Sequence, residues 1–498
     1  MTHLRKPTLI LLVILSIAVI LFLRLYRVVD LYTFGIDEEV IFFHAWEQVK
    51  DFHPIWIGVS VFQANYYLGP GLIYLTAFFL KISQGDLSIL AYGAALTGLL
   101  TTYLVYYCGQ TITGSRKVAF IAAVLYGGSA WINFFDRLYW NPSFIPLLTI
   151  LTLYALAKLP QDKRYIILLG ILYGAYLHVH ISLCILAPII GIAILKCVRT
   201  IPKKYFLLAI LGYMVVTSPL MVFDYYHNYD NLLMPYRMIS KDAKISLPRD
   251  PTNTKMSHAK VLFEALGRFW YLAPPKSAPS NTCESIVCGP SVQTALSLGS
   301  ILLIGMALVK AKRTYAHILL WSAGGIYVLG FIVFPGYPME YYLTGLCIIL
   351  PFLFAQPLSH LNKYVLYIVL AAFLTANVYA VTQSNQDEHG LTVRKELVSD
   401  TIRELHDAPY TLETDLRYGM TYNDYGGWRY AFGIYGYAPV SSFADPVYGW
   451  IYKNELRTEK PRYRVVVSDA KEYKASTKPL FRFTKGIYHS YIFDYERN

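Results

Sequence analysis

The sequence predicts an α-helical polytopic membrane protein with a small polar domain at its C-terminal end. Of the 498 residues, 55% are hydrophobic and only 15% are charged, whereas soluble domains carry about 25% charged residues. Apolar runs of about 20 residues, the length that crosses a bilayer as a helix, recur along the chain. Lys and Arg gather in the short segments between these runs, as in cytoplasmic loops of membrane proteins. The net charge of +12 therefore requires no nucleic-acid partner.

The apolar runs predict eleven membrane-spanning helices. The first run could also be a secretory signal, but it is long for one, and no small-residue cleavage site follows it. We therefore expect an uncleaved first span with Arg5 and Lys6 in the cytoplasm. The expected spans are 8–22, 87–108, 118–135, 143–157, 165–182, 184–196, 205–222, 291–309, 315–334, 341–357 and 364–382.

One further apolar run, 66–82, is short, aromatic and interrupted by Gly69-Pro70-Gly71. If it does not cross the membrane, the basic clusters at 116–117, 158–164, 196–204 and 310–313 all lie on the side of the N-terminus. The positive-inside rule makes that side the cytoplasm. We therefore expect 66–82 to form a helix in the outer interface.

This topology divides the chain into a membrane domain, 1–382, and a soluble extracytoplasmic domain, 383–498. Helical spacing at 391–406 and alternation at 462–469 predict a small α/β fold for the second. The outer side of the membrane domain would hold the first loop, 28–86, a large loop, 223–290, and the short segments 135–142 and 334–342.

Two of the six cysteines, Cys283 and Cys288, fall in the large outer loop. A disulfide is the favoured interpretation, because the outer side is often oxidising. A metal site is the alternative, but no second pair of Cys or His accompanies these two residues.

Three consecutive acids, Asp37, Glu38 and Glu39, follow the first span in the stretch FGIDEEVIFF. A structural explanation is available: Asp37 could cap an interfacial helix over 38–50, with the other two acids near its positive end. A functional one is that a carboxylate accepts a proton from an acceptor hydroxyl.

Other polar and aromatic residues are expected on the same face. Each alone has a structural explanation, such as snorkelling of Arg or a buried His with ordinary hydrogen bonds. Together they are notable, because ionisable groups at membrane depth are costly and usually functional. Arg is well suited to hold a phosphate, and tyrosines can line a slot for a sugar or a lipid head. The candidates for donor binding are Arg137, His178, His180, Tyr66, Tyr67, Glu340, Tyr341 and Tyr342.

The layout resembles that of the GT-C membrane glycosyltransferases, and within them the glycosyltransferase family 39-like group of protein O-mannosyltransferases and aminoarabinose transferases. The resemblance covers about residues 8–380 and is most specific at Asp37-Glu38 after the first span. The segments YYLGPGLIYLTAFFLKI, FFDRLYWNPSFIPLLT and YPMEYYLTGLCIILP carry the rest. Arg137 matches an Arg of the family, and Asn141 stands near the place of a family Asp.

The resemblance implies a GT-C-like fold and transfer of a sugar from a polyprenyl-phosphate donor to an acceptor on the non-cytoplasmic face, with inversion. It implies Asp37 as the base with Glu38 beside it. No cofactor is required by the sequence, although some relatives use a divalent metal, for which Glu38, Glu39 or His44 would be the candidate ligands. The acceptor could be a protein, a lipid or a glycan.

Three other classes remain open. A lipid-glycan ligase or polymerase would share the donor chemistry. A secondary transporter would be expected to show repeated halves with a site at the midplane, and no such repeat stands out. A structural or receptor-like membrane protein would fit the soluble C-terminal domain but would not need acids beside the first span.

Overall fold

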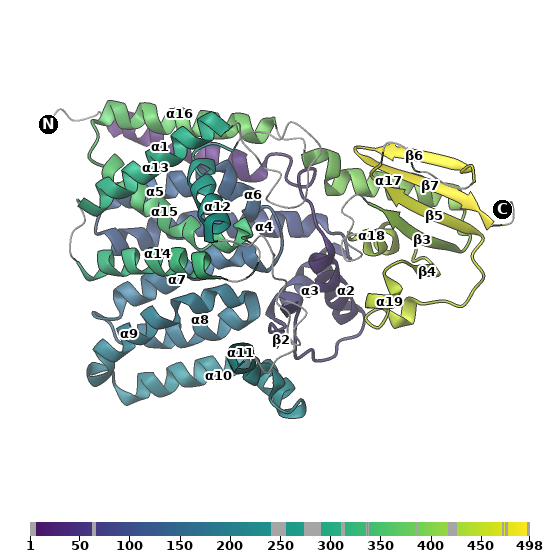
Figure 1. Cartoon of the computed structure of the whole chain (residues 1–498), viewed down its shortest axis with the longest axis horizontal. Coiled ribbons are helices and arrows are strands. Elements are labelled where there is room, and N and C mark those ends of the chain that lie inside the picture. Colours follow the sequence, from purple (N-terminus) through teal and green to yellow (C-terminus); the bar gives the residue numbers. More distant parts are fainter. Residues whose placement is uncertain are drawn as a thin grey trace.

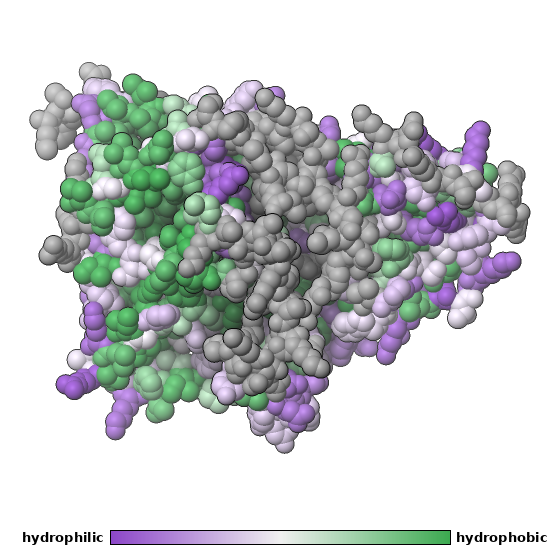
Figure 2. Space-filling view, in the orientation of Figure 1, coloured by the Kyte–Doolittle hydropathy of each residue, from purple (hydrophilic) through white to green (hydrophobic). Residues whose placement is uncertain are grey.

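A computed structural model gives the fold as a helical bundle with a five-stranded sheet beyond one end (Figure 1). It describes residues 6–61, 66–240, 255–272, 290–309, 314–334, 336, 338–383, 386–416, 426–470, 473 and 477–495. Apolar side chains cover much of the visible face of the bundle, while the face over the sheet is largely polar (Figure 2). This is the surface expected of a protein embedded in a bilayer with a water-exposed domain.

The bundle contains α-helices and, at some of the junctions between them, short 3-10 helices. Its elements are α1 (Lys6–Leu25), α2 (Ile36–Lys50), α3 (Gly71–Ser83), α4 (Ser88–Thr113), α5 (Arg116–Gly128), α6 (Ala130–Asp136), η1 (Asn141–Phe144), α7 (Ile145–Lys158), α8 (Tyr165–Val179), η2 (Ile181–Leu186), α9 (Ala187–Cys197), η3 (Val198–Thr200), α10 (Lys203–Tyr226), α11 (Asp230–Ser240), α12 (Lys255–Arg268), α13 (Pro290–Val309), α14 (Tyr315–Val333), η5 (Glu340–Leu343), α15 (Leu346–Leu358) and α16 (Lys363–Thr382).

The multi-pass membrane architecture is confirmed. Within the described ranges, six helices are long and apolar enough to cross a membrane, and the bent pair of α5 and α6 would make a seventh. α8 and α15 are apolar but shorter, as is the 12–25 part of α1. The expected number of eleven spans stays a prediction, because these helices fall below the length of about 20 residues that a straight span needs.

The first outer loop holds α2 and α3, which lie at the end of the bundle next to the sheet (Figure 1). A short antiparallel pair, β1 (Ser60–Val61) and β2 (Tyr66–Tyr67), connects them. Gly35, and not Asp37, is the N-cap of α2, so the helix begins two residues before the expected 38–50. Its backbone therefore includes Asp37 in the first helical turn.

A sharp break separates α5 from α6, whose axes differ by 66°. Ser129 lies at the break and accepts a hydrogen bond from the backbone of Ile132, while its hydroxyl donates to the carbonyl of Phe269. The side chain of Asn377 on α16 accepts from Ala130 N–H at 2.7 Å. Backbone groups freed by a break inside a membrane protein must find such partners, because lipid offers none.

The C-terminal domain is a mixed sheet with helices. Its strand order is β4-β3-β5-β7-β6; β4, β3 and β5 run parallel, and β7 is antiparallel to its neighbours β5 and β6. The helix expected at 391–406 and the strand expected at 462–469 are both present, as α17 and β5. The elements are η6 (Gln386–His389), α17 (Leu391–Leu405), β3 (Tyr410–Asp415), α18 (Trp428–Tyr435), β4 (Ser441–Ser442), α19 (Asp445–Tyr448), η7 (Lys453–Glu455), β5 (Tyr463–Ser468), β6 (Phe481–Lys485) and β7 (Tyr488–Asp494).

Replacing Asn377 by Ala should destabilise the protein, because the N–H of Ala130 and the carbonyl of Trp270 both lose a buried partner. Each unpaired buried group costs about 1–3 kcal/mol. The measurement is the thermal midpoint of the purified protein in detergent. Thr375→Ala, at an exposed position of the same helix, is the control and should change the midpoint little. Equal midpoints for both variants would contradict this account of the break.

Candidate active site

The acids that follow the first span lie in the first turn of α2, close to buried aromatic groups. Glu38 is buried, and its Oε2 accepts a hydrogen bond from the N–H of Gly35 at 3.0 Å. Burial, and after it the nearby carboxylate of Glu38, raises the pKa of the Tyr32 hydroxyl. That hydroxyl is buried and has no hydrogen-bond partner among the described residues. The carboxylate of Glu38 and the hydroxyl of Tyr32 are therefore two buried polar groups that lie near each other.

Glu39 has a different environment, in the contact with the C-terminal domain. It is 1% exposed. Its Oε2 accepts from Gly427 N–H at 3.1 Å, and its Oε1 accepts from Tyr430 N–H at 3.0 Å. Burial raises the pKa of Glu39 to about 7, despite these hydrogen bonds. The structure thus uses Glu39 to hold the first turn of α18.

Two buried arginines meet where α6 ends against α1. Arg24 forms an ion pair with Asp136, which also accepts from the Tyr126 hydroxyl at 3.0 Å. Arg137 donates to the carbonyl of Leu23 at 2.8 Å, and Asn133 donates to the same oxygen at 2.6 Å. Nε and Nη2 of Arg24 and Nε of Arg137 have no hydrogen-bond partner in the described part of the chain. The two cations exceed the single carboxylate, so this region has unsatisfied donors and an excess of positive charge.

The expected donor residue Glu340 lies in an ion pair. Its Oε1 accepts from Arg268 at 2.9 Å and from the indole of Trp131 at 2.8 Å. These contacts tie η5 to α12 and to α6, and Glu340 is 2% exposed. Glu340 therefore helps to hold α6 in place through Trp131.

The two histidines of the expected site have separate environments, because α8 ends between them. Nδ1 of His178 accepts from the N–H of Gly71 at 3.0 Å, and Nε2 is 2.7 Å from the carbonyl of Val216. A Cβ on Gly69 would lie only 2.3 Å from the same ring. His178 thus connects α3, α8 and α10, with both ring nitrogens engaged.

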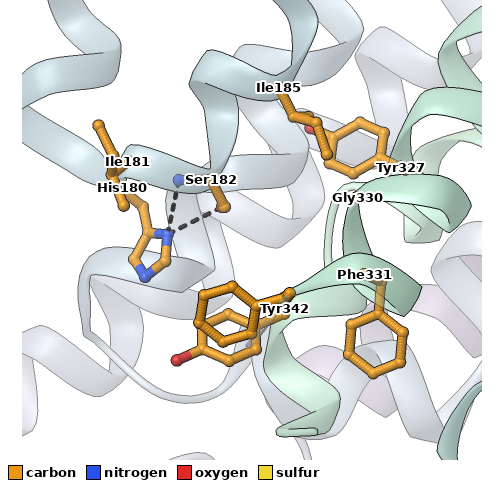
Figure 3. A pocket seen from close by; sticks show the side chains of 9 residues that line it. His180, Ile181, Ser182, Ile185, Tyr327, Gly330, Phe331 and Tyr342 are labelled. Atoms are coloured by element: carbon orange, nitrogen blue, oxygen red, sulfur yellow. Dashed lines mark hydrogen bonds between the residues drawn. The ribbon is translucent and has the colours of Figure 1, made fainter. Parts of the chain in front are cut away.

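His180 instead lies on the wall of a cavity of about 320 Å³ (Figure 3). Its Nδ1 is 2.8 Å from the hydroxyl of Ser182, and its other ring nitrogen points away from that residue. The ring of Tyr342 lies 6.1 Å from that of His180. The remaining walls are largely apolar and come from η2 and α14: Ile181, Ile185, Tyr327, Gly330, Phe331 and Phe334. A largely apolar cavity with a few polar groups is typical of a small-molecule or lipid site.

The segment from Asp136 to Asn141 connects the buried arginines, α3 and the cavity of His180. Tyr139 packs edge-on against Phe79 of α3. Trp140 packs against Tyr341, whose hydroxyl donates to that of Tyr342 at 3.0 Å. Asn141 donates to the carbonyls of Val179 at 3.0 Å and His178 at 3.4 Å. One segment of six residues therefore links the buried arginines to the cavity of His180.

Of the remaining expected residues, Tyr66 lies beside this cavity and Tyr67 contacts α10 and α11, and the others lie outside the described residues. Tyr66 packs against Met234 and Ile181, and Ile181 itself lines the cavity. The backbone of Tyr67 donates to Asn231 at 2.6 Å. The side chain of Asp37 and the pair Cys283 and Cys288 lie outside the described residues.

A divalent metal is not supported by the residues that the structure describes. They contain no group of three or more His, Cys, Asp or Glu side chains able to hold a metal ion. Glu39 binds the backbone of α18, and the ring of His44 packs against Trp450 at 5.4 Å.

Sequence reasoning missed Arg24 and Arg268. Arg24 was detectable, because it directly follows an apolar run and an ionisable group at membrane depth indicates a partner or a function. Arg268 had no such signal, because it falls within the stretch expected to form the large outer loop, 72 residues from its partner Glu340.

Part of the membrane domain matches the model of a known protein family. Residues 68–223 match the family model of the dolichyl-phosphate-mannose-protein mannosyltransferases. No curated protein sequence matches the chain.

Solved structures match nearly the whole chain. ArnT from Cupriavidus metallidurans bound to undecaprenyl phosphate matches with a TM-score of 0.64 and 10% identity, over 98% of each chain. Its apo state gives 0.62 at 10% identity and the same coverage. The apo oligosaccharyltransferase of Archaeoglobus fulgidus gives 0.50 at 12% identity, over 93% of this chain and 70% of the other. The predicted resemblance is thereby confirmed: the protein is a multi-pass membrane protein with a GT-C fold like that of ArnT.

Proposed function

We propose that the protein is a membrane glycosyltransferase that moves a sugar from a polyprenyl-phosphate donor to an acceptor hydroxyl on the extracytoplasmic face. The observation that carries the proposal is the segment Asp136–Asn141, which joins the buried arginines to the apolar cavity. A polyprenyl-phosphate donor has the matching chemistry: an anionic head and a long apolar chain. The family match and the fold support the same reading.

The donor phosphate would lie near Arg137 and Arg24. Their unsatisfied nitrogens supply donors, and two guanidinium groups against one carboxylate leave a positive excess. Such fixed charges stabilise a leaving phosphate strongly, because they are already in place and shielded from water. Bidentate geometry makes Arg well suited to this task.

The isoprenoid chain would lie in the cavity between η2 and α14. Its walls are largely apolar, with His180 and Tyr342 as polar groups. His180 and Tyr342 would contact the head group, and Tyr341 and Trp140 would separate the chain from the reacting centre. His178 would act as a structural brace and would not bind the donor.

Asp37 would act as the base, with Glu38 beside it. The acceptor oxygen would form a bond to the anomeric carbon while the bond from that carbon to the phosphate oxygen breaks. The hydroxyl proton would pass to Asp37, and the lipid phosphate would leave, held by the arginines. An in-line displacement of this kind inverts the anomeric carbon.

The orientation belongs to the same proposal. The N-terminus would be cytoplasmic and the C-terminal domain extracytoplasmic, because the basic clusters then lie on the cytoplasmic side. The acids of α2 lie at the end of the bundle that carries the sheet (Figure 1), so the reaction would occur at the outer surface.

Asp37→Asn should lower sugar transfer by about 10²–10⁴-fold, the usual contribution of a general base. The assay supplies a panel of radiolabelled polyprenyl-phosphate sugars with host membrane extract and follows label leaving the lipid. Asp51→Asn, at the other end of α2, is the matched control and should keep full activity. Full transfer by Asp37→Asn would show that the base lies elsewhere, and absence of any transfer by the wild type would overturn the proposed function.

Ile185→Trp should fill the cavity and raise KM for a long-chain donor at least tenfold, because Ile185 forms part of its wall. KM for a short-chain analogue should change little. Ile192→Trp, at an exposed position of α9, adds the same bulk outside the cavity and serves as the control. A similar KM for both donors in Ile185→Trp would place the carrier chain elsewhere.

The two histidines should respond oppositely to replacement by Ala. His178→Ala leaves the N–H of Gly71 unpaired, at a cost of about 1–3 kcal/mol, and removes the contact of the ring with the carbonyl of Val216, so the thermal midpoint should fall. His180→Ala should leave the midpoint nearly unchanged and raise KM for the donor. The reverse pattern would exchange the roles given to these residues.

A further inference from the structure

The C-terminal domain binds the first outer loop at both of its ends. Near the start of the loop, the carbonyl of Tyr32 accepts from Leu391 N–H at 2.9 Å, and Asp30 accepts from Thr392 at 2.6 Å. At its end, Asp86 accepts from Lys395 at 3.0 Å. Between these points lies α2, with the acids of the proposed reaction.

The contact that Glu39 makes between these points is also buried. Both carboxylate oxygens of Glu39 accept hydrogen bonds from the first turn of α18, from Gly427 and Tyr430. Gly427 is the N-cap of α18 and has no side chain to cap the helix. Glu39 supplies that cap from α2, where a negative charge is favoured by the free N–H groups and the positive end of the helix dipole.

Close packing surrounds these hydrogen bonds. The ring of Tyr430 lies 5.2 Å from Phe43 and 5.7 Å from Phe42, both on α2. Gly427 has a φ of +83°, and a Cβ there would come within 2.1 Å of the Phe34 ring. Glycine at this position therefore satisfies both the left-handed backbone and the close approach of the two parts.

We infer that Glu39 is a positioning residue: by capping α18 it fixes the first turn of α2, and with it Asp37 and Glu38, against the C-terminal domain. This inference rests on the proposed function, because it assigns the purpose of the contact to sugar transfer. Glu39 is adjacent to Glu38 and two residues from Asp37, so any shift of its backbone moves both. Misplacement of a reacting group by about 1 Å can cost about 10²-fold in rate.

The charges around Glu39 agree with a contact that holds a carboxylate in a buried place. Burial raises its pKa to about 7, while the amides of Tyr430 and Gly427 and the charges of Arg429 and Arg394 lower it. Arg394 lies over the ring of Phe34 at 4.5 Å, and Arg429 lies over Tyr452 at 4.1 Å. A buried carboxylate is costly unless hydrogen bonds compensate it, and here two backbone donors do so.

The test compares Glu39→Gln with the wild type in full-length protein. Gln keeps the shape but turns one acceptor into an NH₂ group that faces an N–H donor. We expect kcat to fall at least tenfold, with KM for the donor within twofold. Glu39→Asp keeps the charge but has a shorter side chain, so its kcat should lie between those of the wild type and Glu39→Gln. It takes the place of Glu39→Gln in the test if that variant does not fold. Lys395→Met removes a more exposed contact of the same domain, one that contributes little, and should leave kcat within twofold.

Hydrogen–deuterium exchange supplies a readout that does not need activity. In Glu39→Gln, the amides of 38–43 and 427–432 should exchange faster, while those of the sheet stay protected. Wild-type exchange together with wild-type kcat in that variant would overturn the inference, as would a loss of protection with kcat unchanged. If the wild type transfers no sugar from any donor while the variant loses protection, the proposed function fails and the positioning role fails with it, whereas the cap on α18 stands.

Discussion

The break at Ser129 is the constraint on which the rest of the site depends. A helix that bends by 66° between hydrophobic neighbours exposes backbone groups that lipid cannot satisfy. Asn377 and the carbonyl of Phe269 satisfy them from two other helices. Because the break is held in this way, α6 leaves the direction of α5 and delivers Asp136 and Arg137 to the end of α1. If α6 continued along the axis of α5, it would not run toward the end of α1.

The charges at the end of α6 follow from that geometry. Arg24 and Asp136 compensate each other inside the bundle, and a Cβ on Gly98 would come within 2.7 Å of Arg24, so α4 passes close beside the pair. Elsewhere on α6, Trp131 shares one oxygen of Glu340 with Arg268. Buried ion pairs contribute little net stability, but breaking one leaves a costly unpaired charge. They therefore fix the position of α6, and Nε of the second arginine, Arg137, is buried without a hydrogen-bond partner among the described residues.

The sequence predicted regular elements well and the site only in part. The helix over 391–406 and the strand over 462–469 have a clear period, and tertiary contacts did not override it. The break at Ser129 lies within a continuous apolar run, 118–135. The residues that satisfy its backbone and hydroxyl groups, Phe269 and Asn377, are 140 and 247 positions away from their partners. Hydropathy cannot report such contacts. His178 and His180 look alike in sequence, yet they differ because α8 ends between them.

The sequence indicated where the three acids of the first loop lie, but it did not explain why there are three. Asp37 was considered as a cap of α2, and that position belongs to Gly35. Glu38 accepts a hydrogen bond from the N–H of Gly35. Glu39 caps α18 in the C-terminal domain, where its partner Gly427 lies 388 positions later in the chain. A short helix at the membrane interface does not cross the bilayer, so the bilayer does not fix its position relative to the bundle. Its place must come from what packs on it, so the C-terminal domain forms part of the architecture of the site even though the described residues of that domain lie outside the proposed reaction.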